Sequence, residues 1–262
     1  MCRLAAYIGP PVALSQVIVD PSHSLLEQSI HATEAKLTVQ GDGFGFAWYD
    51  DSRDMGLYRD VLPAWSDGNL LSLCRMIRSP LFLAHVRAST SGETSRVNCH
   101  PFAVGNWSFM HNGQVPQIET IRRPLEATLP DNLYAARRGT TDSELIFLLL
   151  LANGLQDDPY GAVRRVLDLL HTHGRGSGAP TALRTTCVLS DGQTLYAFRH
   201  ATDNRAPTLY VKQNEDGSHI LASEPLEPTR DGWNAIGSDQ FVTITKDETR
   251  VVDLWRSCAK IA

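Results

Sequence analysis

The sequence lacks the cysteine pairs that are typical of disulfide-rich and zinc-binding proteins. A chain of 262 residues is long enough to build a hydrophobic core without such cross-links. An odd number of scattered cysteines favours reduced thiols over a disulfide framework or a zinc site. The chain has five cysteines, none of them in a Cys-x-x-Cys pair: Cys2, Cys74, Cys99, Cys187 and Cys258.

A membrane span, a leader segment and a basic block are also missing. The longest apolar run, LIFLLLLANGL, falls short of the roughly 18 residues that cross a bilayer. The N-terminus lacks the basic start and long apolar stretch of a signal peptide. A formal net charge of -5 argues against nucleic acid or an anionic membrane as the main partner. We therefore expect a cytoplasmic protein that binds a small molecule or another protein.

The apolar patterning predicts an α+β fold. Short runs such as GFGFAWY and TTCVLS alternate with turn signals such as DGQ and EDGS, which favours antiparallel hairpins. Many antiparallel strands with few helices indicate sheets packed on one another with helices outside. Apolar residues three and four positions apart predict helices over residues 22–30, 69–78, 142–153 and 159–171.

The N-terminus, MCRLAAYIGPP, carries a cysteine directly after the initiator methionine. Removal of Met1 would place a thiol and a free α-amine on one residue, where the amine can act as general base for the thiol. Their reference pKa values, roughly 8.5 for the thiol and roughly 7.7 to 8.0 for the amine, lie close to neutrality. Cys2 is thus a candidate nucleophile, although a small residue near a terminus is the ordinary explanation.

Further stretches combine polar residues with apolar runs, in a fixed order after the N-terminal MCR. Together they resemble the class II glutamine amidotransferases, which are N-terminal-nucleophile hydrolases. The stretches are GDGFGFAWY (41–49), AHVRASTSG (84–92), NCHPF (98–102), FMHNG (109–113) and GTTDSELI (139–146).

This resemblance implies a four-layer αββα sandwich of two antiparallel sheets. It implies one amidotransferase domain over residues 1–262 with no attached synthase domain, and no cofactor or metal. In such a site Cys2 attacks the side-chain amide carbon, and the side chain of Asn112 and the backbone N–H of Gly113 stabilise the oxyanion. Loss of one such donor typically costs about 10²- to 10³-fold in rate.

The resemblance also implies a clamp for a free amino acid head. Arg87 would hold the substrate α-carboxylate through its planar fork, and Asp142 would accept the substrate ammonium. Thr90 would contact the substrate. The remaining substrate-binding positions are Asp42 and Gly43 in a glycine-rich turn and His111 in the His-Asn-Gly motif.

Without the resemblance, each motif has a simpler interpretation. Arg87 is a surface charge, His-Asn-Gly is a tight turn, and Thr-Asp-Ser-Glu is a helix N-cap. The histidines lack the spacing of a metal site, so we expect His85, His100 and His111 to be hydrogen-bonded core residues.

Several stretches look closest to a stand-alone branch that includes ergothioneine-pathway γ-glutamyl hydrolases. Synthase-linked members often carry Trp and His where this chain has Ala88 and Ser91. We expect an enzyme that cleaves γ-glutamyl amides and either releases an amine or passes ammonia to a separate synthase subunit. The alternatives are a non-catalytic glutamine-binding subunit and an N-terminal-cysteine acylase, which would not require the Arg87 and Asp142 pair.

Overall fold

The computed structural model describes residues 2–89, 93–175 and 182–255, and the structural statements that follow concern these residues. They form two antiparallel sheets. The first sheet has the strand order β11-β9-β10-β1-β4-β2-β3. Its strands are β1 (Arg3–Ala13), β2 (Phe44–Tyr49), β3 (Met55–Asp60), β4 (Arg78–Val86), β9 (Tyr210–Gln213), β10 (His219–Ala222) and β11 (Trp233–Ala235).

The second sheet has the order β13-β12-β8-β7-β6-β5. Neighbouring strands in it are antiparallel, as hairpin-rich sequence predicts. Its strands are β5 (Phe102–Val104), β6 (Trp107–Gln114), β7 (Arg184–Ser190), β8 (Leu195–Ala201), β12 (Gln240–Ile244) and β13 (Thr249–Asp253).

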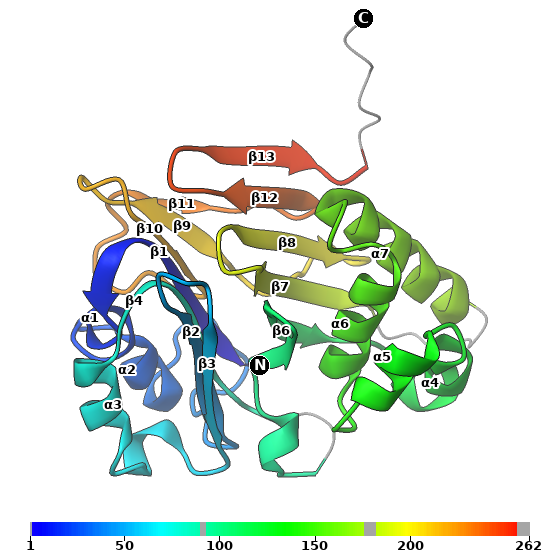
Figure 1. Ribbon diagram of the computed structural model, residues 1–262, viewed down its shortest axis with the longest axis horizontal. Coiled ribbons are helices and arrows are strands. Elements are labelled where there is room, and N and C mark those ends of the chain that lie inside the picture. The colour runs from blue at the N-terminus through cyan, green and yellow to red at the C-terminus, as the bar shows by residue number, and fades with distance from the viewer. Residues whose placement is uncertain (1, 90–92, 176–181, 256–262) are drawn as a thin grey trace, which may run out of the picture.

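Helices cover the outer face of each sheet, so the molecule has four layers (Figure 1). The first sheet carries α1 (Ser15–Ile18), α2 (Leu25–Ile30) and α3 (Leu70–Met76). The second sheet carries α4 (Ile118–Glu126), α5 (Asp131–Ala136), α6 (Asp142–Ala152) and α7 (Pro159–Arg175). Two 3-10 turns, η1 (Ala64–Ser66) and η2 (Arg96–Asn98), lie in connecting segments.

Strand β1 has apolar side chains on both of its faces, and one of these faces packs against the second sheet. Leu4, Ala6 and Ile8 belong to the cluster between the sheets, whereas Ala5 and Tyr7 pack on the side of α1–α3. Successive side chains of a strand point to opposite faces. A strand with apolar residues at both odd and even positions is therefore buried on both faces. This strand, β1, is the middle strand of the first sheet.

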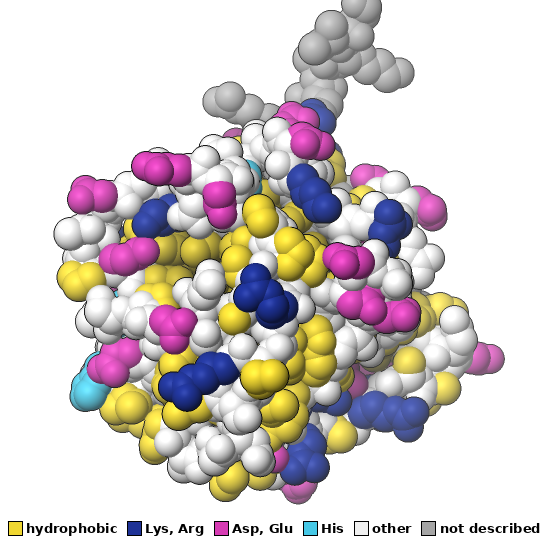
Figure 2. All heavy atoms as spheres, turned by 60° about the vertical axis from the view of Figure 1, so that its left-hand side comes forward, with side chains coloured by type: hydrophobic (Ala, Val, Ile, Leu, Met, Phe, Trp, Pro, Cys, Tyr) yellow, Lys and Arg dark blue, Asp and Glu magenta, His cyan; other side chains and the backbone are white. Residues whose placement is uncertain are grey.

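The outer surface over α1–α3 has a mixed character. Figure 2 brings this side forward and shows basic and acidic side chains interspersed with apolar ones. The exposed large apolar residues of α3 and the segment before it include Trp65, Leu71 and Met76. Single exposed apolar side chains are ordinary on protein surfaces, and no one sign of charge dominates the face in view.

The four predicted helices are present as α2, α3 and α6, which are shorter than predicted, and α7, which continues to Arg175. In the described part of the chain, three further α-helices, α1, α4 and α5, were not predicted. The missed α4 does carry helical periodicity, since Ile118, Ile121 and Leu125 form its buried face. Pro124 inside it obscures the pattern, because proline normally ends a helix. Among the described residues, no helix is long and apolar enough to span a membrane.

Two histidines lie side by side in the interior. His85 on β4 and His100 are both buried, and their ring centroids are 4.1 Å apart. Burial lowers the pKa of His85 to about 3. Burial and the neighbouring His85 also lower the pKa of His100 far below its usual value. Both imidazoles are therefore neutral in the folded protein at pH 7.

Because these buried histidines are neutral, we expect the free energy of unfolding to decrease in mild acid. The unfolded chain protonates His85 near pH 6.5, whereas the folded chain resists protonation down to about pH 3. Stability from His85 is thus complete above pH 6.5 and falls as the pH drops through this window, by at most about 1.4 kcal/mol per pH unit. His85→Phe should flatten the pH dependence of the free energy of unfolding, measured with urea between pH 7 and 4.

His31→Phe is the matched control, because the His31 side chain is 71% exposed. This variant retains His85, so the loss of stability in mild acid should persist. Parallel curves for His85→Phe and the wild type would contradict the assignment of a neutral buried His85.

Candidate active site

Cys2 lies at the edge of the space between the two sheets. It precedes β1 and has the same parity as Leu4 and Ala6, which point toward the second sheet. Asn112 on β6 lies opposite and donates its Nδ2–H to the Cys2 carbonyl oxygen over 2.7 Å. Figure 1 shows the start of β1 next to β6. The meeting of these two strands therefore places a cysteine beside an asparagine.

A small pocket opens around Cys2. Its lining comes from segments that are far apart in the sequence but meet at the ends of β1, β4, β6 and α6. The lining residues are Cys2, Arg87, Ala88, Ser89, His100, His111, Asn112, Gly113, Thr141, Asp142 and Ser143. The pocket thus collects residues from four of the five motifs that follow the N-terminal MCR.

The Cys2 thiol is half-buried and contacts the backbone of Ala88. The Ala88 N–H lies 3.4 Å from Cys2 Sγ, and the Ala88 carbonyl oxygen lies 3.5 Å from it. Burial raises the pKa of the Cys2 thiol, while the Ala88 N–H and the positive charges of Arg87 and Arg3 oppose this rise. The net effect favours the neutral thiol, so reaction at neutral pH requires a base close to the sulfur.

Gly113 occupies a position that admits no side chain. Its φ is +154°, and a Cβ atom there would lie 1.9 Å from the carbonyl oxygen of Arg184 and 2.7 Å from His111 Nε2. The alternative interpretation of His-Asn-Gly as a tight turn is wrong, because all three residues lie within strand β6, which pairs with β7. The glycine reflects this close approach and the unusual φ.

His111 points away from Cys2, toward the start of α6. Its Nδ1 lies 2.9 Å from Ser143 Oγ. Burial lowers the pKa of His111, and the charge of Asp142 only partly offsets this. His111 lines the pocket as a neutral ring.

Arg87 is buried rather than on the surface, with an exposed fraction of 3%. Its guanidinium donates to Ser89 Oγ over 3.1 Å and to the Asp42 carbonyl oxygen over 3.4 Å. Asp42 and Gly43 themselves are not among the residues that line the pocket. The Asp42 carboxylate accepts the Ser89 N–H over 2.7 Å, and Gly43 accepts the Arg87 N–H. The two residues hold the segment that carries Arg87.

Asp142 is the first residue of α6, and Thr141 is its N-cap, as the Thr-Asp-Ser-Glu pattern predicts. Thr141 Oγ1 accepts the Glu144 N–H over 3.1 Å. The Asp142 carboxylate accepts the N–H groups of Val115 and Ser143, each over 2.9 Å. These donors fix the carboxylate of a residue that lines the same pocket as Arg87. Thr90 lies outside the described residues.

Several polar atoms in the pocket wall have no hydrogen-bond partner among the residues that the structure describes. They are Asn112 Oδ1, His111 Nε2 and both ring nitrogens of His100. Buried polar atoms are rarely left unpaired. This wall is therefore suited to a polar ligand or to water.

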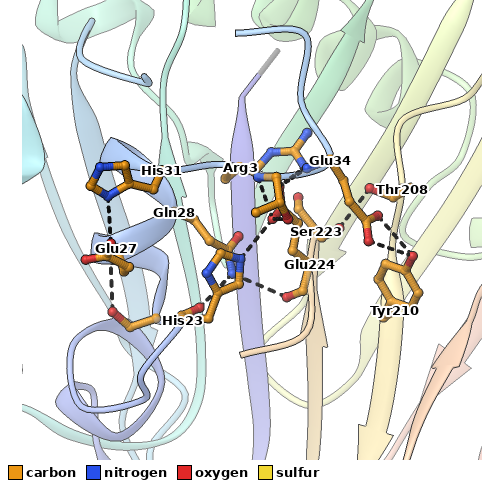
Figure 3. Close-up of polar contacts among 12 residues, drawn as sticks. Arg3, His23, Glu27, Gln28, His31, Glu34, Thr208, Tyr210, Ser223 and Glu224 are labelled. Carbon is orange, nitrogen blue, oxygen red and sulfur yellow. Dashed lines mark hydrogen bonds and ion pairs between the residues drawn. The ribbon is translucent and has the colours of Figure 1, made fainter. Parts of the chain in front are cut away.

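Sequence reasoning missed a buried ion pair that begins one residue after Cys2. Arg3 and Glu224 form a buried ion pair beneath the start of β1 (Figure 3). Both belong to stretches that stand out in the sequence, MCR and ASEPL, but no spacing rule indicates that they meet. In the described part of the chain, no three His, Cys, Asp or Glu side chains are grouped so that they could hold a metal ion.

The arrangement suits chemistry on an amide that carries a free amino acid head. A thiol, an amide N–H donor, a guanidinium and a carboxylate belong to residues that line one pocket. Opposite charges at fixed positions can recognise a zwitterion, because each pairs with the group of opposite sign.

Comparisons with known proteins agree with this arrangement. The family model described as "Glutamine amidotransferases class-II" matches residues 12–212. A probable glutamine amidotransferase from Saccharomyces cerevisiae is 30% identical, with 94% of this chain and 82% of that protein covered. A gamma-glutamyl-hercynylcysteine sulfoxide hydrolase from Mycolicibacterium smegmatis is also 30% identical, with 93% and 96% covered.

Solved structures agree as well. A glutamine aminotransferase class-II domain protein from Silicibacter pomeroyi superposes with a TM-score of 0.78 at 37% identity, over 97% of this chain and 100% of that chain. Glutamine phosphoribosylpyrophosphate amidotransferase from B. subtilis has a TM-score of 0.67 at 13% identity, over 98% and 50%. The latter confirms the expected N-terminal-nucleophile hydrolase fold. With a family match over most of its length and relatives that it covers almost end to end, the chain belongs to the class II glutamine amidotransferases.

Proposed function

We propose that the protein hydrolyses γ-glutamyl amides, with Cys2 as nucleophile, after removal of Met1. The observation that carries the proposal is the convergence of Cys2, Asn112, Arg87 and Asp142 on one pocket. A non-catalytic binding subunit has no need of a thiol there. An acylase for fatty or bile acid amides has no need of the buried Arg87 and Asp142.

The reaction proceeds in two steps, acylation of Cys2 and hydrolysis of the thioester. The α-amine of Cys2 takes the thiol proton as Sγ attacks the δ-carbon, and the same amine gives the proton to the departing nitrogen as the C–N bond breaks. A γ-glutamyl thioester and ammonia or an amine result. Water then attacks the thioester, the amine again carries the proton, and glutamate leaves with regeneration of the thiol. The half-buried thiol is neutral because its pKa is raised, and this is the reason for a base on the same residue.

Two charged side chains bind the α-carboxylate and the α-ammonium of the glutamyl group, and Asn112 stabilises the oxyanion of the transition state. The Arg87 guanidinium pairs with the α-carboxylate, and Asp142 accepts hydrogen bonds from the α-ammonium. Asn112 Nδ2 uses one N–H for the Cys2 carbonyl, and its second N–H and the Gly113 N–H serve the oxyanion. Thr90 contacts the bound substrate, whereas Asp42 and Gly43 act through Arg87. Residues 1–262 form one amidotransferase domain in this proposal.

The leaving group is an amine on a small molecule or ammonia. Two relatives, from Mycolicibacterium smegmatis and Mycobacterium tuberculosis, are named as hydrolases of a γ-glutamyl conjugate and align over nearly all of this chain. This similarity supports direct hydrolysis of a conjugate. A comparison of kcat/KM for glutamine and for γ-glutamylcysteine S-conjugates distinguishes this from ammonia supply to a synthase subunit.

Cys2→Ala should abolish turnover and leave the circular dichroism spectrum and melting temperature close to those of the wild type. The reason is that the variant removes the attacking atom and little buried surface. In the wild type, a diazo-ketone glutamine analogue should add once, on a Cys2 that has lost Met1, as read by intact mass and peptide mapping.

Cys74→Ala is the matched control, because this buried thiol on α3 does not line the pocket. It should retain activity and labelling. Turnover by Cys2→Ala at the wild-type level would remove the proposed nucleophile.

Asp142→Asn should weaken glutamate binding by about one to two decades in Kd. The variant loses a charge-assisted hydrogen bond to the ligand ammonium, worth about 1.5–3 kcal/mol. Isothermal calorimetry checks this, with Asp131→Asn on α5 as the control. An unchanged affinity in Asp142→Asn would contradict the proposed clamp.

A further inference from the structure

Arg3 links the carbonyl group of Cys2 to a carboxylate in another part of the chain. Its Nε donates to the Cys2 carbonyl oxygen over 2.7 Å, and its Nη1 lies 3.0 Å from Glu224 Oε1. The two charged side chains are 0% and 1% exposed. Figure 3 shows the guanidinium and the carboxylate facing each other beside β1. The ion pair is therefore one hydrogen bond from the proposed nucleophile.

Glu224 is itself held from several directions. Its two oxygens accept the N–H groups of Thr33 and Glu34, over 3.0 and 2.9 Å, and the hydroxyl of Thr33 over 2.6 Å. His23 Nε2 lies 2.9 Å from it. Burial by itself would raise the pKa of Glu224, but these hydrogen bonds outweigh it and lower the pKa to about 2. Glu224 therefore remains a carboxylate over the working pH range.

The backbone on both sides of the pair is also fixed. Leu4, next to Arg3, donates its N–H to Ser223 Oγ over 3.0 Å and accepts the Ser223 N–H over 2.9 Å. Gln28 donates to the Glu224 carbonyl oxygen over 3.3 Å. These hydrogen bonds of the adjacent backbone thus hold Arg3 at the start of β1 and Glu224 opposite it.

Stability alone does not account for such a pair. Removing two charges from water is costly, and well-packed apolar residues often replace a buried ion pair without loss of stability. Arginine has one property here that apolar residues lack, a planar set of donors that bonds the Cys2 carbonyl and the Glu224 carboxylate at once.

We propose that Arg3 is a positioning residue for Cys2 and that Glu224 holds Arg3 in place. Arg3 on β1 and Asn112 on β6, in the other sheet, both donate a hydrogen bond to the Cys2 carbonyl oxygen. Rotation of this peptide would move both the thiol and the α-amine of Cys2, so the two donors set the attack geometry. The inference rests on the proposed function, because it assigns a support to the proposed nucleophile.

The charge of Arg3 also acts on the thiol. Together with Arg87 it opposes the rise in the pKa of Cys2 that burial causes. The other titratable groups that line the pocket are His100 and His111, which burial keeps neutral, and Asp142. The effect of Arg3 on the position of Cys2 and its effect on the thiol pKa can therefore be separated by one variant that keeps the charge and one that removes it.

Arg3→Lys is the main test, since it keeps the charge opposite Glu224 but cannot bond both partners in the planar arrangement. We expect kcat for γ-glutamyl-p-nitroanilide to fall about 10²-fold, the size of effect that a small misplacement of a reacting group produces. KM and the pH midpoint of Cys2 alkylation by iodoacetamide should remain near the wild-type values. Arg230→Lys, at a side chain 65% exposed, is the matched control and should change neither.

Arg3→Met removes the charge as well, so the pH midpoint of Cys2 alkylation should rise above that of the wild type. If this variant does not fold, Glu224→Gln replaces it and should lower kcat with KM unchanged. A folded Arg3→Lys protein with wild-type kcat and only a lower melting temperature would overturn the proposal, as would a change confined to KM.

Different results would contradict Cys2 as nucleophile and Arg3 as its positioning residue. A wild-type protein that is not labelled at Cys2 by the diazo-ketone analogue contradicts the proposed function before any Arg3 variant is made. Labelling at Cys2, with Arg3→Lys indistinguishable from the wild type, contradicts the positioning role of Arg3 alone.

Discussion

The hydrogen bond from Asn112 Nδ2 to the Cys2 carbonyl oxygen joins the two sheets at the place where the pocket opens. Asn112 belongs to β6 of one sheet, and Cys2 leads into β1 of the other. The stacking of the sheets through the apolar side chains between them fixes the distance across this gap. The pocket therefore depends on the sandwich as a whole, and a change in the stacking would separate Cys2 from Asn112.

Around this bond, the interior holds polar groups in two different ways. Arg3 and Glu224 pair with each other, Arg3 also donates to the Cys2 carbonyl oxygen, and Glu224 accepts hydrogen bonds from Thr33 and Glu34. His85 and His100 instead remain neutral, because burial disfavours the imidazolium and a second ring lies 4.1 Å away. An unpaired buried charge would cost several kcal/mol, so both solutions avoid one close to the pocket.

The charged pocket walls depend on backbone groups that hold them in place. Val115 and Ser143 donate to Asp142, and Asp42 bonds the backbone of Ser89, two residues after Arg87. Groups fixed in this way need little rearrangement to meet a ligand of opposite charge. This is consistent with recognition of a small zwitterion, where the positions of two charges matter more than apolar area.

Much of this protein was predictable from the sequence. The helical periodicity of four segments, the N-cap at Thr141 and the order of the motifs are local patterns, and each predicts an element or a family without knowledge of the fold. The resemblance carried by the motifs identified nine site residues, of which the structure brings Cys2, Arg87, His111, Asn112, Gly113 and Asp142 to one pocket. The supporting roles of Asp42 and Gly43 required the structure.

What the sequence by itself determined is therefore the α+β class, four of the α-helices and the residue types that a γ-glutamyl site requires, since these follow from periodicity and motif order. Only the tertiary structure decided which distant residues meet. Arg3 and Glu224 are separated by 221 positions, and Asn98 bonds Thr140 across 42. The physical reason is that such contacts arise from the stacking of sheets and the pairing of β1 with β10, which depend on the whole chain and leave no spacing signal in its sequence.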